Sequence, residues 1–231
     1  MTRALTRTHF HSSRLIRILT DLAAVRGGEP GTAFAEKLGL WVDYTHAITL
    51  CAVHNASPQP DASPAAPAAT AAALAPGLGE EFAQLRAGLE RAMAAGNLPT
   101  PEPADMPPDT STAFEPYRRY YLTQQRDMEQ KVGPLRARLR EALTQASPRL
   151  AQLAALDAAL DGILSEREGK LLSALAQLLK KRFAHLRQSL PPAAWLAQFG
   201  QELQTVLLAE LDLRLQPAVG LLEALHNEKT K

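Results

Sequence analysis

The chain has 231 residues, and its 25 basic and 24 acidic side chains leave a formal net charge of +1. Apolar residues make up 46% and charged residues 21%, which argues against a wholly disordered chain and allows one or two domains. Among the apolar residues, 41 Ala and 38 Leu stand against 6 Val and 4 Ile. Because Leu and Ala favour helices whereas strands favour β-branched and aromatic residues, we expect an all-α fold rather than a sheet-based enzyme core.

The sequence lacks a pair of cysteines, a signal peptide and a membrane-spanning segment, and these absences indicate the cellular compartment. Cys51 is the single cysteine, so it forms no internal disulfide, which is typical of a reducing compartment. The basic N-terminus contains no continuous apolar stretch of a signal peptide, and no segment of about eighteen apolar residues is present. We therefore expect a cytoplasmic protein without a membrane span.

Residues 1–56 are predicted to form a pair of helices. Ser12 or Ser13 can cap the first helix, and Thr32 can cap the second, which runs to about Asn55. A glycine-rich turn separates the two helices.

Residues 57–111 are predicted to contain two linkers and one short helix. The stretches 57–77 and 97–110 are rich in Pro and Ala, a composition typical of semi-extended linkers. Between them, residues 79–95 form an amphipathic segment, and Gly96 after it indicates a left-handed C-cap.

Residues 112–231 are predicted to form a bundle of long helices. Thr112 and Glu115 match a capping box that opens the first of these helices. Gly133 and Pro134 indicate a break within it, because proline removes a backbone hydrogen bond.

The next helix starts where Ser147 can act as N-cap and Pro148 can occupy the first helical position. The stretch 148–190 fits one long helix or two shorter ones. A last helix is expected over 192–226. Short turns between these helices make neighbours antiparallel, so we expect an elongated helical hairpin or bundle that resembles a coiled coil.

Candidate metal and catalytic residues are weak in this sequence. His46, Cys51 and His54 share one predicted helix but do not face one point, as zinc ligands must. Asp157 and Asp161 share a helix face, and we interpret them as a solvated or interhelical charge pair rather than as catalytic carboxylates. No phosphate loop, dinucleotide fingerprint or nucleophile elbow occurs. We therefore expect no enzyme activity, no cofactor and no metal.

A basic stretch lies between residues 117 and 140. Its tyrosines share the apolar side of the projected helix, so we expect them in the core. Its arginines indicate a solvated face, a face that meets an acidic partner, or a nucleic-acid-binding face: Arg118, Arg119, Arg126, Arg136 and Arg140.

The last predicted helix has an unusually wide apolar arc of about 220°, whereas packing on one neighbour needs only about 100°. Glu210 and Arg214 lie inside this arc at the spacing of an ion pair. Two interpretations stay open. The pair is structural, or it sets the register of a partner helix on a surface formed by Glu210, Arg214, Trp195, Phe199 and Leu213.

Four segments resemble a known family: FAEKLGLWVDYTHAITL at 34–50, FEPYRRYY at 114–121, GPLR at 133–136 and LLAELDLRLQPAVGLLEAL at 207–225. They make the chain similar to an uncharacterised proteobacterial family, catalogued as a domain of unknown function, serial three-three-four-eight. The likeness covers essentially the whole chain apart from the linkers. The family has no established activity, cofactor or site residues, so the resemblance assigns none here.

The resemblance does imply a setting. Genes of this family tend to lie beside those for a MotA/TolQ-like inner-membrane channel protein and an OmpA-like peptidoglycan-binding protein. It therefore implies a cytoplasmic accessory to an envelope machine, with the channel protein as a candidate partner. Our leading expectation is a non-enzymatic helical interaction or scaffold protein that binds a protein partner or itself. The alternative is a nucleic-acid-associated protein that uses the basic face.

Overall fold

A computed structural model describes Arg14, Leu15, Ile18 and the ranges 44–56, 67–99, 101 and 106–228. The regular structure in these ranges is entirely helical, which confirms the all-α expectation. The helices are α3 (Tyr44–Asn55), α4 (Pro67–Ala92), the 3-10 helix η2 (Ala95–Asn97), α5 (Thr110–Ala146), α6 (Pro148–Ser189) and α7 (Pro192–Glu228).

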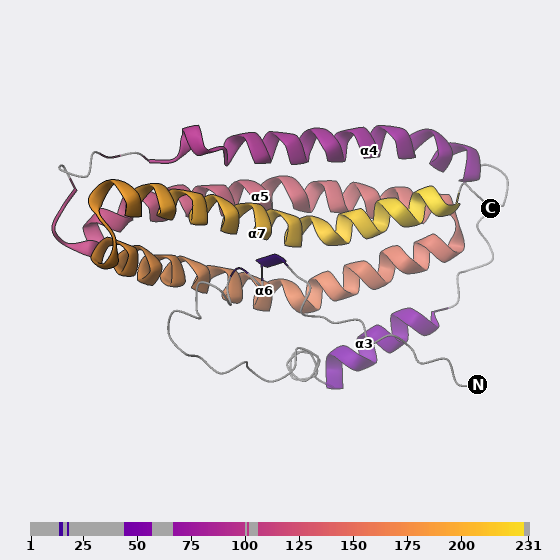
Figure 1. The fold of residues 1–231 in the computed structure, drawn as a ribbon. Coiled ribbons are helices and arrows are strands. Elements are labelled where there is room, and N and C mark those ends of the chain that lie inside the picture. The colour runs from indigo at the N-terminus through magenta and orange to yellow at the C-terminus, as the bar shows by residue number, and fades with distance from the viewer. Residues whose placement is uncertain are drawn as a thin grey trace, which may run out of the picture.

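Four long helices run side by side in an elongated bundle (Figure 1). Helices α5 and α7 lie between α4 and α6, and α3 packs on the outside of α6. Consecutive long helices are antiparallel (Figure 1). Only Ser147 separates α5 from α6, and only residues 190–191 separate α6 from α7, as the predicted short turns required, whereas α4 and α5 are joined by the longer stretch 93–109. The last twelve residues of the second predicted N-terminal helix are present as α3, and its earlier part, residues 32–43, lies outside the described residues. Most of the first lies outside the described residues, although Arg14, Leu15 and Ile18 are helical.

Helix α4 differs from the linker expected over 57–77, because it begins at Pro67 rather than near residue 79. Alanine has the highest helix propensity, and proline fits the first helical position. Ala75 is fully buried in a cluster with leucines of α5, α6 and α7, which stabilises the helix on either side of the exposed Pro76. The segment expected as a linker therefore supplies the start of the fourth bundle helix.

Helix α5 begins earlier and runs further than predicted. Its N-cap is Asp109, whose carboxylate accepts from the backbone N–H of Thr112 at 2.8 Å, so the predicted capping box is wrong. The helix also continues through Gly133 and Pro134. Pro134 has no N–H group to donate to the carbonyl group one turn earlier in the helix. Because Gly133 and Pro134 face solvent, whereas Val132 is buried, that carbonyl group lies on the hydrated side of the helix.

Helix α6 is one continuous helix of 42 residues, which answers the question left open by its two glycines. It is about 63 Å long at ~1.5 Å per residue. Ser147 caps it, with its hydroxyl accepting from the N–H of Leu150, and Pro148 occupies the first turn as predicted. At the end of α4, Gly96 lies in η2, and not in the left-handed conformation that we expected.

The core has an aromatic half and an aliphatic half. Where the first turns of α5 and α7 meet the end of α6, five rings pack at mostly edge-to-face angles with centroids 5.0–6.2 Å apart. They belong to Phe114, Tyr117, Phe183, Trp195 and Phe199. At the other end, leucines of α5, α6 and α7 surround Ala75.

Replacing Phe199 by alanine should lower the free energy of unfolding by about 3–5 kcal/mol, because it empties a fully buried aromatic site. Urea titration of both proteins measures this difference. The exposed neighbour Gln201→Ala serves as a control and should change stability by less than about 0.5 kcal/mol. Equal stabilities of the Phe199→Ala variant and the wild type would contradict the packing described.

Candidate functional site

A buried carboxylate lies at the centre of the bundle. Glu210 of α7 has 0% of its surface exposed and accepts hydrogen bonds from two helices. The Tyr121 hydroxyl donates to its Oε2 at 2.6 Å, and the Gln125 amide donates to both oxygens at 3.0 and 3.1 Å. On α7 itself, Arg214 donates from Nε to Oε1 at 3.0 Å, and its Nη2 lies 2.9 Å from the same oxygen. The Gln125 amide also reaches the carbonyl of Leu172, so this network connects α5, α6 and α7.

Glu210 therefore interacts with Arg214 and with α5 within the bundle, and the pair does not form the exposed partner-binding surface that was one of the two interpretations of the sequence. Burial, followed by the charge of Glu210, raises the pKa of Tyr121, so its hydroxyl stays protonated and donates. Trp195 and Phe199 are also buried in the aromatic cluster, and only Leu213 and Arg214 of the five expected surface residues are partly exposed. The wide apolar arc of α7 is explained by its position, since three long helices of the bundle contact it.

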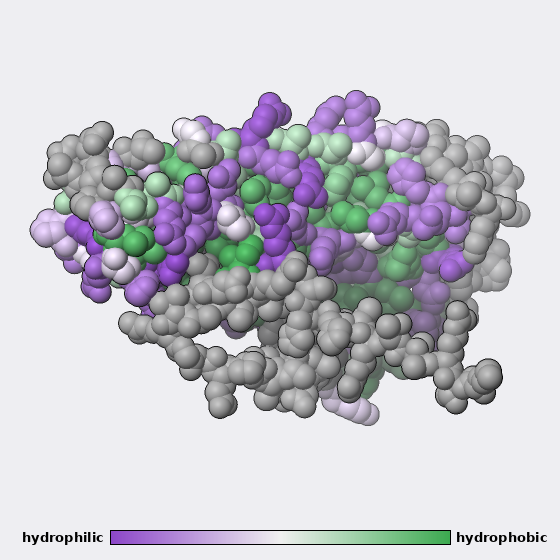
Figure 2. Space-filling view, in the orientation of Figure 1, coloured by the Kyte–Doolittle hydropathy of each residue, from purple (hydrophilic) through white to green (hydrophobic). Residues whose placement is uncertain are grey.

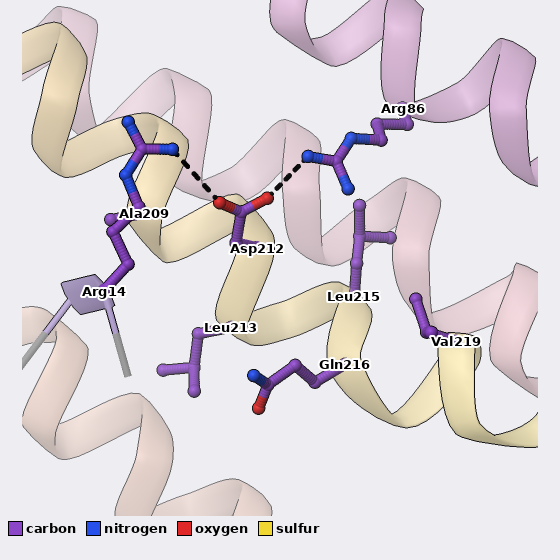
Figure 3. A pocket seen from close by; sticks show the side chains of 8 residues that line it. All are labelled: Arg14, Arg86, Ala209, Asp212, Leu213, Leu215, Gln216 and Val219. Atoms are coloured by element: carbon purple, nitrogen blue, oxygen red, sulfur yellow. Dashed lines mark hydrogen bonds and ion pairs between the residues drawn. The ribbon is translucent and has the colours of Figure 1, made fainter. Parts of the chain in front are cut away.

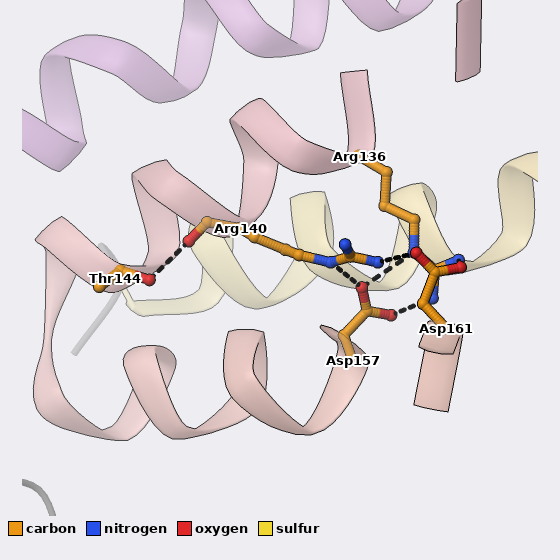
Figure 4. A network of polar contacts seen from close by, with 5 residues as sticks. All are labelled: Arg136, Arg140, Thr144, Asp157 and Asp161. Atoms are coloured by element: carbon orange, nitrogen blue, oxygen red, sulfur yellow. Dashed lines mark hydrogen bonds and ion pairs between the residues drawn. The ribbon is translucent and has the colours of Figure 1, made fainter. Parts of the chain in front are cut away.

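A second polar network joins α5 to α6 (Figure 4). Arg136 and Arg140 lie one turn apart on α5, and each donates to both Asp157 and Asp161 on α6, at distances of 2.6–2.9 Å. The two carboxylates therefore form an interhelical charge network, in agreement with our interpretation of them. Nearer the C-terminal end of α6, Arg182 donates two hydrogen bonds to Glu202 of α7.

The predicted basic face is not a row of free arginines. Arg136 and Arg140 are directed toward α6 and are mostly buried by that network. Arg118 and Arg119 both pair with Glu115 and are exposed, as is Arg126. The tyrosines of this stretch face inward as predicted. The arrangement leaves only part of the expected face accessible to phosphate groups.

A hollow of about 340 Å³ lies on α7 beside Asp212 (Figure 3). Arg86 of α4 and Arg14 approach the Asp212 carboxylate from opposite sides, at 2.7 and 3.3 Å. Around this charge cluster the lining is mostly aliphatic: Ala209, Leu213, Leu215 and Val219, with Gln216 at the edge. In the orientation of Figure 1, Figure 2 shows apolar patches among polar residues along the middle of the molecule.

Sequence reasoning did not find this site. Helical projection places Asp212 on the polar side of α7, and its partners lie 126 and 198 positions away in the sequence. No local pattern connects residues at such separations. The charge of Asp212 between two aliphatic stretches was the one available signal.

Within the described ranges, no three His, Cys, Asp or Glu side chains gather as metal ligands would. None of the helices placed by the structure is both long enough and apolar enough to cross a bilayer. Cys51 is exposed on α3 as a free thiol.

The chain belongs to the family described as Protein of unknown function (DUF3348), whose model matches residues 1–227. This confirms the resemblance seen in its four sequence segments. Neither the curated proteins nor the solved structures contain a match to the chain.

Replacing Arg214 by methionine should lower the free energy of unfolding by about 3 kcal/mol, because it removes the cation beside a fully buried carboxylate. Adding Glu210→Gln to that variant should restore part of the loss, because no buried charge is then left. Urea titration of the single and double variants measures both effects. If Arg214→Met alone proves as stable as the wild type, the ion pair does not support the core.

Acid should weaken the α5–α6 network. Burial raises the pKa of Asp157, but hydrogen bonds from Arg136 and Arg140 outweigh this effect and hold the pKa below its ordinary value of 3.8. A carboxyl whose pKa is lower in the folded state contributes stability that is complete above about pH 4 and is lost as the pH falls through the folded-state pKa.

The Asp157→Asn variant should therefore be less stable than the wild type near neutral pH, and this difference should shrink below about pH 4. Urea titrations at several pH values measure it. The variant of the exposed residue Glu129, Glu129→Gln, is the control and should keep the pH dependence of the wild type. A stability difference for Asp157→Asn that stays constant with pH would show that this pKa is not shifted by folding.

Proposed function

We propose that this chain is a non-enzymatic helical interaction protein that binds a protein partner on the α7 face around Asp212. The observation that carries the proposal is the contact of Leu15 and Ile18 with the bundle beside Arg14 and Asp212. A short helical piece from a distant part of the sequence already packs there, and an aliphatic hollow with one charged side suits helix docking.

The buried polar groups support binding rather than catalysis. Glu210, Asp157 and Glu202 each accept hydrogen bonds from an arginine of the bundle. Burial raises the pKa of Asp157 and of Glu202, but hydrogen bonds from the arginines outweigh this effect and hold both pKa values below the ordinary ones, so these two carboxylates are poor general bases. These groups are therefore suited to holding helices in register.

The candidate partner comes from the family resemblance. An inner-membrane channel protein of the MotA/TolQ type, contacted from the cytoplasm, fits the gene neighbourhood of the family. The chain would then act as an accessory of an envelope system that also contains an OmpA-like protein.

Site-specific photo-cross-linking in bacterial cells tests this proposal. A photoreactive residue at Gln216, on the edge of the hollow, should cross-link to the channel protein. The same residue at Gln130, exposed on α5, is the matched control and should not cross-link to it. Absence of the channel protein from the Gln216 products, or equal yields at both positions, would contradict the proposal. Salt-sensitive DNA binding that is lost on replacing Arg126 would favour the nucleic-acid alternative instead.

A further inference from the structure

The contact between the N-terminal segment and the bundle has the form of helix docking. Arg14, Leu15 and Ile18 are helical, and their spacing places them on neighbouring positions of one helix face. Leu15 is only 4% exposed and belongs to the aromatic half of the core, and Ile18 packs against the same cluster. In Figure 1 this piece is drawn between α6 and α7. The bundle therefore accepts an aliphatic anchor from a separate helical segment.

The Arg14 side chain can leave this contact without leaving the Asp212 carboxylate unpaired. The Arg14 side chain is 51% exposed, and its hydrogen bond to Asp212 is long at 3.3 Å. Asp212 also accepts a 2.7 Å hydrogen bond from Arg86 of α4. If Arg14 leaves, Asp212 keeps Arg86 as its partner. Exposed ion pairs of this kind contribute little to stability.

The hollow beside Asp212 continues along α7 into a second hollow, and we call the two together the α7 groove. This second hollow of about 490 Å³ shares Val219 with the first and extends along α7 to Asn227. Its lining again combines aliphatic and aromatic carbon with polar groups: Phe82, Val219, Leu222, Glu223, His226 and Asn227. Together the two hollows follow α7 over about five turns.

The charges along this groove indicate what would bind in it. The Asp212 carboxylate already binds Arg86 and accepts Arg14 as a second cation. The exposed Glu223 is eleven positions further along α7, about 20° around the helix and about 16 Å along it from Asp212. Aliphatic side chains lie between them. An amphipathic helix with an aliphatic stripe and basic residues at both ends, three turns apart, matches this pattern.

We propose that the α7 groove is a docking site for a basic amphipathic helix of a partner, and that the chain's own Arg14, Leu15 and Ile18 occupy its Asp212 end until that helix displaces them. The proposal rests on the proposed interaction function and adds the chemistry of the partner and a self-blocking contact. The partner helix carries a basic residue followed, one and four positions later, by aliphatic residues, as Arg14, Leu15 and Ile18 do.

Peptide binding to the purified full chain tests this proposal. The probe is a fluorescent synthetic peptide with the sequence of residues 8–24, and the key variant of the chain carries Leu15→Asp and Ile18→Asp. The double variant should bind the peptide about ten- to hundredfold more tightly than the wild type, as expected if the segment occupies its groove in about 90% to 99% of molecules. Fluorescence anisotropy measures both affinities.

Two controls separate docking from a general effect of exposed charge. A chain with Ile48→Asp and Leu171→Asp, both exposed positions outside the groove, should bind the peptide as the wild type does. A peptide that itself carries Leu15→Asp and Ile18→Asp should not bind. The single variant Arg14→Glu leaves Leu15 and Ile18 intact and places a like charge against Asp212, so it should tighten peptide binding severalfold even if the double variant does not fold. Unchanged peptide affinity in Arg14→Glu would overturn the proposal.

Two further results distinguish this inference from the function on which it rests. If the wild type and the double variant cross-link equally to the channel protein through Gln216, the interaction function stands and the self-blocking contact is wrong. If the double variant binds the peptide but neither chain captures the channel protein, the groove stands and the proposed partner is wrong. A wild-type dimer that dissociates on the double substitution would assign the contact to a second copy and overturn the self-blocking contact.

Discussion

A carboxylate with no exposed surface must be neutralised and hydrogen-bonded where it lies, because removing it from water costs several kcal/mol. Glu210 meets this requirement through partners on α5 and α7, and Gln125 extends the network to α6. A shift of α7 by one residue relative to α5 would separate Glu210 from Tyr121 and Gln125 and leave its charge buried. Apolar packing alone tolerates several registers of leucine-rich helices, so this polar network selects one of them.

The other features of the fold are compatible with that register. With Glu210 beside Tyr121, the first turns of α5 and α7 bring their aromatic rings together, and the later turns bring their leucines together. The same register places Asp212 on the outside of α7, within reach of Arg86 on α4. Asp212 follows the buried Glu210 by two positions, and residues two positions apart point to nearly opposite sides of a helix. The packing of Glu210 in the core therefore fixes where the proposed docking face lies.

Sequence reasoning was most reliable where one local signal dominates. The excess of Ala and Leu predicted the all-α fold, and Ser147 with Pro148 predicted a helix start. It was wrong where tertiary contacts outweigh a local rule. Pro76 and Pro134 lie inside helices because buried neighbours hold those helices on the core and each proline faces solvent.

The candidate site was less predictable than the fold. The apolar arc of α7 was recognised, but periodicity does not tell whether the chain's own helices or a partner cover it, so Glu210, Trp195 and Phe199 were expected on a binding surface. The contacts of Asp212 join positions that are more than a hundred residues apart. Only the folded arrangement reveals such a cluster.

Native-state hydrogen exchange tests most directly whether the Glu210 network holds the bundle together. If it does, the amides of residues 206–214 in α7 and 121–128 in α5 should exchange only on global unfolding, whereas those of α3, which buries no side chain, should exchange much earlier. Exchange of the amides around Glu210 before those at the aliphatic end of α7 would contradict the account, because it would show that this network opens while the rest of the bundle stays folded.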